Sequence, residues 1–206
     1  MKRTMSLPSR LLLVICASLA LSPLIARADA DLPEAAVYAA LFEHLAPKDG
    51  AARTVVLGTQ PSGRDEVFAA AGPTESMEEA LRRGVPEASP ALRAAFLGEL
   101  KRAAPLKAHE LPNKSTLKFQ LVPQQELDDL FWSIPTSEAW ARFHRRFPQA
   151  SARMSLSRPV MDPATDTALV YVGSSCGRLC GGGWLVFMTR QGGVWLVSRE
   201  VQLWIA

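Results

Sequence analysis

Residues 167–206 read TALVYVGSSCGRLCGGGWLVFMTRQGGVWLVSREVQLWIA, and this stretch decides the fold. It holds three apolar runs of strand length, 167–174, 183–190 and 194–206, rich in β-branched and aromatic residues. The last two runs are joined by Gln191-Gly192-Gly193, and glycine adopts the positive φ of a tight hairpin turn at little steric cost. We therefore expect an antiparallel meander, and the alternating stretch 153–160 adds a fourth strand.

The residues before this meander indicate helices interrupted by two isolated strands. The segment Pro33–Leu45 has the i, i+4 apolar spacing of an amphipathic helix. Ser76-x-x-Glu79 is a capping box for a helix that Gly84 ends, and Ser89-Pro90 begins another. The strands are expected at 53–59 and 115–122, an extended segment at 107–113, and two more helices at 124–132 and 137–147. The predicted class is α+β, with N-terminal helices packed on a C-terminal antiparallel meander of three to four strands.

The first 30 residues have the features of an export signal. A basic start precedes the apolar stretch Leu11–Ile25, and Ala28-Asp29-Ala30 follows with the small-x-small pattern of a cleavage site. The apolar stretch of about 15 residues is shorter than the roughly 20 that a membrane-spanning helix needs. We expect residues 1–30 to be a cleaved signal peptide of a bacterial protein and no integral membrane segment to remain after cleavage. Residues 31–206 would then form one periplasmic or secreted domain.

The net positive charge of the chain comes from the predicted signal peptide. Four of its 23 basic residues but only one of its 20 acidic residues fall within the first 30 positions, so the remainder is balanced. Nucleic-acid binding rests on clustered positive charge that neutralises phosphates. A balanced domain is therefore not expected to bind nucleic acid.

The loop 173–184, GSSCGRLCGGGW, contains Cys176 and Cys180 and connects two predicted strands. In an oxidising compartment two cysteines at this spacing favour a disulfide, which would close a hairpin loop and contribute only about 2 kcal/mol. The other readings are a redox pair, half of a zinc site and a cysteine nucleophile. A redox pair is normally Cys-x-x-Cys at a helix start, and zinc needs further ligands that the three histidines do not offer at paired spacing.

The rest of the sequence contains none of the common catalytic motifs. The chain lacks a Gly-x-Ser-x-Gly elbow, His-Glu-x-x-His, a P-loop and a dinucleotide glycine pattern, and no metal or cofactor is expected. Glu126, Asp128 and Asp129 cannot all share one helix face, which favours a solvated surface. Arginines at 142, 145, 146, 153 and 158 are a candidate patch for an anionic partner. The candidate binding residues are Ser174, Ser175, Arg178, Arg145 and Arg146.

The C-terminal half resembles an uncharacterised family of small exported bacterial proteins. The shared pattern is an aromatic helix ending in Phe/Tyr-Pro, a serine-containing strand, Cys-Gly-x-Leu-Cys-Gly-x-Gly, a tryptophan strand and a closing Trp-Ile-small. The likeness covers about Gln124–Ala206 and implies a domain and export but no activity. The meander is also similar to the end of nuclear-transport-factor-like cones, a likeness at the level of fold alone. The residues that carry the family pattern are Trp140, Phe143, Phe147, Pro148, Ser155, Ser157, Cys176, Gly177, Leu179, Cys180, Gly181, Gly183, Trp195, Trp204, Ile205 and Ala206.

Together these patterns predict an exported domain that binds and does not catalyse, with a rigid hairpin loop as its contact surface. An inhibitor, an immunity protein or an envelope accessory protein would fit, with a partner in the envelope or secreted. The alternative is a small-ligand or enzymatic pocket between the sheet and the helices. Convergent polar groups in a cavity would favour that alternative.

Overall fold

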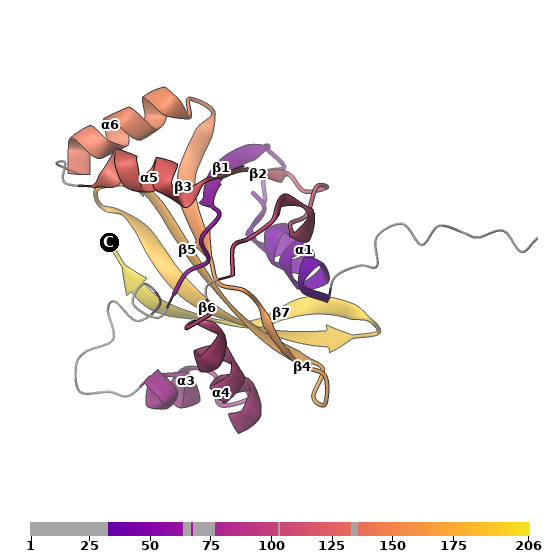
Figure 1. Cartoon of the computed structure of the whole chain (residues 1–206). Helices are drawn as coiled ribbons and strands as arrows, with labels where there is room; N and C mark the ends of the chain where they lie inside the picture. Colours follow the sequence, from indigo (N-terminus) through magenta and orange to yellow (C-terminus); the bar gives the residue numbers. More distant parts are fainter. Residues whose placement is uncertain (1–32, 64–66, 68–76, 103, 133–135) are drawn as a thin grey trace, which may run out of the picture. The chain divides into compact units, whose positions relative to one another are not determined.

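The computed structural model describes residues 33–63, 67, 77–102, 104–132 and 136–206. The predicted signal peptide and the N-cap residue Ser76 lie outside these ranges. The described residues belong to a single compact unit (Figure 1). Its elements are α1 (Pro33–Leu45), β1 (Arg53–Gly58), α3 (Met77–Gly84), α4 (Pro90–Glu99), the 3-10 turn η1 (Ala108–Glu110), β2 (Leu117–Val122), α5 (Gln124–Phe131), α6 (Thr136–Arg146), β3 (Ala150–Leu156), β4 (Val160–Asp162), β5 (Thr167–Gly177), β6 (Cys180–Gln191) and β7 (Val194–Ile205).

Seven strands of the described part form one sheet in the order β2-β1-β3-β5-β6-β7, with β4 beside β5. The antiparallel ladders β3–β5, β5–β6 and β6–β7 are the predicted meander and its fourth strand. The α+β class is confirmed. The Gly192-Gly193 turn is confirmed as well, because both residues have positive φ, 58° and 86°.

The two isolated strands of the sequence complete the same sheet in parallel orientation. β1 lies between β2 and β3 and runs parallel to both. Parallel neighbours need long crossover connections, and helices occupy both of them: α3 and α4 between β1 and β2, and α5 and α6 between β2 and β3. The sheet is therefore mixed.

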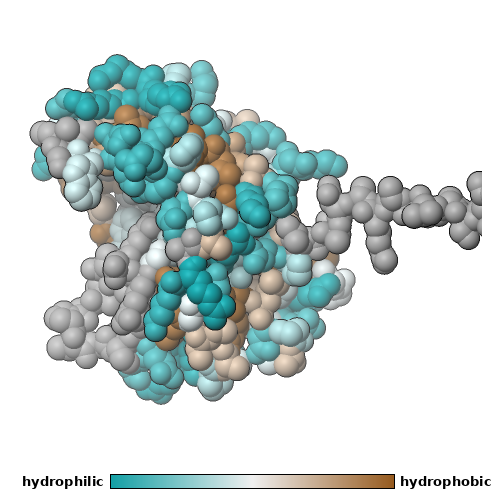
Figure 2. Space-filling view, in the orientation of Figure 1, coloured by the Kyte–Doolittle hydropathy of each residue, from teal (hydrophilic) through white to brown (hydrophobic). Residues whose placement is uncertain are grey.

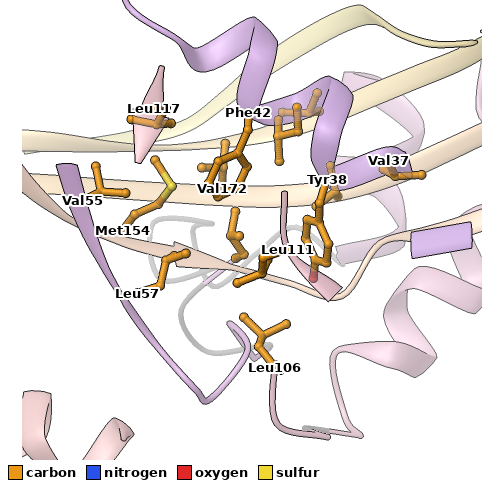
Figure 3. Packing of buried hydrophobic residues seen from close by; sticks show 14 of the residues in the cluster. Val37, Tyr38, Phe42, Val55, Leu57, Leu106, Leu111, Leu117, Met154 and Val172 are labelled. Carbon is orange, nitrogen blue, oxygen red and sulfur yellow. The ribbon is translucent and has the colours of Figure 1, made fainter. Parts of the chain in front are cut away.

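Helix α1 covers one face of the sheet. Its side chains Val37, Tyr38, Leu41 and Phe42 are fully buried in a cluster with residues of β1, β3, β5, β6 and β7. Figure 3 labels Val37, Tyr38 and Phe42 in this cluster. The hydroxyl of Tyr38 donates to the carbonyl oxygen of Ser157 at 2.9 Å, which satisfies the one polar atom that this side chain brings into the core.

The opposite face carries two separate helix pairs. α3 and α4 pack on β5 and β6, and Ser89 begins α4 as predicted, its hydroxyl accepting the Leu92 N–H at 3.0 Å. α5 and α6 pack on Val56 of β1 through Trp140 and Phe143 of α6 and through Phe147, which follows that helix. Figure 1 shows α1 and α3–α4 on opposite sides of β6 and β7. The outer surface over α5 and α6 is predominantly hydrophilic (Figure 2).

The segment 107–113, expected to be extended, contains the turn η1. The carboxylate of Glu110 accepts the Lys107 N–H at 2.9 Å, which closes the chain into a short turn. The same carboxylate accepts two hydrogen bonds from Arg158, at 2.9 and 3.0 Å. The turn thus places an acidic side chain in the interior, where Arg158 balances its charge.

Candidate functional site

The hairpin between β5 and β6 is closed by a disulfide between Cys176 and Cys180, as the sequence predicts. The strands pair up to Gly177 and Cys180, which leaves Arg178 and Leu179 as a two-residue turn. The register shifts after Ser175, so Cys176 is an extra residue in β5, a bulge. The two Cα atoms are 5.2 Å apart, within the usual range for a disulfide. We call residues 176–180 the stapled tip.

The glycines that follow the tip leave room for neighbouring aromatic side chains. Gly181, Gly182 and Gly183 lie in β6 without positive φ, so their role is to leave space. A Cβ on Gly183 would overlap Trp204 Nε1 and lie 2.6 Å from the Tyr171 hydroxyl. The indole N–H of Trp204 donates to that hydroxyl at 2.9 Å. The missing side chains therefore let two large aromatic residues meet across the sheet.

The C-terminus is held at the same end of the sheet as the stapled tip. Trp204 pairs with Gly183, and the N–H of Ala206 donates to the carbonyl oxygen of Gly181 at 3.0 Å. β7 is therefore the third strand at this end of the sheet, and it supports the stapled tip through its pairing with β6. The disulfide and the Trp204 contact together give the tip a fixed shape.

Two large apolar side chains are exposed at this end of the sheet. Leu179 in the turn is 79% exposed, and Ile205 near the C-terminus is 77% exposed. Arg178 is exposed beside Leu179.

A groove lies next to the tip on the face that α1 covers. It encloses about 340 Å³, and we call it the tip groove. It is lined by Val55, Met154 and Val172 of the sheet, by Leu45 at the end of α1 and by Pro47, which follows that helix. Ser174, a predicted binding residue, lines it together with Cys176 and Trp184. Ser175, which the sequence also predicts as a binding residue, pairs with Gly181 in the antiparallel ladder of β5 and β6.

The arginines of α6 do not join this site. α6 packs on the face opposite the tip groove, so Arg145 and Arg146 lie away from Ser174 and Arg178. Arg146 pairs with Glu126 at 2.7 Å and stands over the Phe147 ring, and Arg142 pairs with Glu138 at 2.7 Å. These partners reduce the positive charge that the arginine series suggested.

Arg158 does not belong to a surface patch for an anionic partner, because only 12% of its side chain is exposed. It pairs with Glu34 of α1 and Glu110 of η1, and donates to the backbone oxygens of Ala104 and Pro105 at 3.1 and 3.0 Å. Burial raises the pKa of Glu34 above its ordinary value despite the neighbouring Arg158. Burial acts in the same direction on Glu110, but the Lys107 N–H and Arg158 outweigh it and lower the pKa of that carboxyl. The cluster is a structural charge network.

Within the described ranges, no group of three or more His, Cys, Asp or Glu side chains could hold a metal ion. Of the helices that the structure describes, none has the length and apolar character needed to cross a membrane.

The sequence predicts the disulfide but not the tip groove. The cysteine spacing lies within one loop and can be read directly. The groove is lined from β1, β2, β3, β5, β6 and the end of α1, so no single segment of the sequence shows it.

Comparisons of the chain with protein-family models, curated proteins and solved structures return no match. The resemblance of the C-terminal half to a family of exported proteins stays a prediction.

Proposed function

We propose that the chain is an exported, non-catalytic binding domain that contacts a protein partner of the cell envelope or the secreted fraction. The observation that carries the proposal is the stapled tip, where Leu179 is 79% exposed on a turn closed by a disulfide. A surface that is already ordered loses little conformational entropy when it binds. The partner is expected to offer an apolar pocket to Leu179.

Periplasmic or secreted localisation is part of the same proposal. The disulfide supports it, since such bonds persist in oxidising compartments, and so does the sequence of residues 1–30. The tip groove supports a contact with a folded or extended protein segment, because it borders the tip and is mostly apolar. Inhibitor, immunity protein and envelope accessory factor are the classes that act by such a contact.

Replacing Leu179 with serine is expected to abolish capture of the partner. The tagged protein would be expressed with its own first 30 residues, and co-purified proteins would be identified by mass spectrometry. Burying a leucine side chain contributes about 1.5–3 kcal/mol, so its removal should weaken the affinity by roughly 10-fold to 150-fold. The fold should be unaffected, because Leu179 has few contacts to lose.

Val194→Ser is the matched control. Val194 is 60% exposed beside the Gly192-Gly193 turn, at the other end of the same strands. This variant should retain the partner. Equal loss with both variants, or undiminished capture with Leu179→Ser, would show that the stapled tip is not the contact surface.

A further inference from the structure

A second pocket lies on the other face of the sheet, at the carboxyl ends of β1 and β3. It encloses about 300 Å³, a size at the lower end of small-molecule sites. We call it the switch pocket. Its lining includes five side chains with polar groups, Gln60, Gln124, Asp128, Arg153 and Ser155. The stapled tip contributes nothing to it.

The pocket occupies the place where open sheets with parallel strands bind ligands. β1 and β3 are adjacent and parallel. In the sheet, β2 lies next to β1 on the side away from β3, and β5 lies next to β3 on the side away from β1. The chain runs from β1 to β2 and from β3 to β5, so the two connections lead away from each other. Connections that diverge from neighbouring parallel strands leave a crevice at the strand ends, as at the topological switch point of doubly wound sheets, although β3 continues here to the antiparallel strand β5.

Local sequence holds this crevice in shape. Gly58 ends β1, and a Cβ there would overlap the Gln124 side chain and lie 3.1 Å from Leu127 Cδ1. Glycine thus lets the first turn of α5 lie against the end of β1. The N–H of Gln124 donates to the Thr59 hydroxyl at 3.2 Å, and its side-chain amide donates to Asp128 at 2.8 Å.

Arg153 brings a positive charge to the lining of the switch pocket. Its side chain is partly buried, and its guanidinium stands 5.3 Å from the centre of the Phe131 ring. Among the described residues it has no carboxylate partner, in contrast to Arg142, Arg146 and Arg158. A forked donor held over an aromatic ring and facing a pocket suits a carboxylate, which accepts two parallel hydrogen bonds.

We infer that the switch pocket binds a small polar carboxylate, with Arg153 holding the carboxylate group. The amide groups of Gln60 and Gln124 and the carboxylate of Asp128 would receive the hydroxyl or amino groups of the same molecule. This inference stands on a different surface from the stapled tip and does not depend on the proposed partner.

Binding can be measured by NMR titration of the disulfide-bonded protein with succinate, L-malate and L-glutamate. The expected result is saturable shifts at Gly58, Gln124 and Arg153 at millimolar or lower concentrations of at least one of them. Succinamide, which has the shape of succinate without its charge, should give none. Because a hydrogen-bonded charge contributes substantially to binding, Arg153→Gln should weaken the affinity about tenfold or more.

Arg190→Gln is the matched control, since Arg190 is an exposed arginine near the end of β6 and does not line the pocket. It should leave the affinity unchanged. Gln124→Glu adds a negative charge to the pocket and should also weaken binding, which keeps the test decisive if Arg153→Gln fails to fold. No saturable shift with any of the three acids, or shifts that survive both pocket variants, would overturn the inference.

Discussion

Replacing Arg158 with methionine is expected to destabilise the domain by about 3 kcal/mol or more. The substitution leaves the carboxylates of Glu34 and Glu110 without their common cation, and removing one partner of a buried ion pair typically costs about 3–5 kcal/mol. It also deprives the backbone oxygens of Ala104 and Pro105 of a donor. Urea unfolding followed by circular dichroism would measure the loss as a lower midpoint.

Arg142→Met provides the comparison. Its pair with Glu138 lies four residues along α6 on the exposed surface, where such pairs contribute about 0.3–0.5 kcal/mol. An Arg158→Met variant no less stable than Arg142→Met would contradict the structural role of the buried network. The network ties α1 and η1 to the chain between β3 and β4, so its loss should lower the stability of the whole domain.

Replacing Gly183 with alanine is expected to cost about 2–3 kcal/mol, an unusually large effect for one added methyl group. The new Cβ would overlap Trp204 Nε1 and crowd the Tyr171 hydroxyl. Overpacking of this kind costs about 1–3 kcal/mol, and displacing the indole also breaks its hydrogen bond to Tyr171. Thermal unfolding monitored by tryptophan fluorescence would measure the combined cost of overpacking and of the lost hydrogen bond as a lower midpoint temperature.

Gly98→Ala tests whether the cost belongs to the site and not to the type of substitution. Gly98 lies in α4, where the nearest atom to a new Cβ is the flexible end of Arg102 at 3.7 Å. Alanine is the better helix former by about 1 kcal/mol, so this variant should be as stable as the parent or more stable. A Gly183→Ala variant with unchanged stability would mean that Trp204 does not pack on β6 as described.

Local patterns in the sequence predicted much of the fold. The stop at Gly84, the start at Ser89-Pro90 and the Gly192-Gly193 turn each depend on a few adjacent residues, and the structure has all three. Pairing between distant strands has no such signal. β1 and β2 were expected as strands, but alternation of side chains does not indicate which neighbour a strand will choose or in which direction.

The same limit applies to the glycines and arginines. Gly181, Gly182 and Gly183 look like a flexible loop until Trp184 and Trp204 are placed over them. Arg158 looks like one more surface arginine until Glu34, 124 positions earlier, is brought beside it. In both cases the role of a residue depends on a partner that only the folded chain supplies.

The most direct test of the account is the oxidation state of Cys176 and Cys180 in protein recovered from the producing cells without reduction. Trypsin cleaves after Arg178, between the two cysteines, and Arg158 is followed by a proline that blocks cleavage. The predicted result is a pair of peptides, 154–178 and 179–190, that remain linked until a reductant is added. Recovery of both peptides separately, each with an alkylated thiol, would contradict the stapled tip and the binding surface proposed to depend on it.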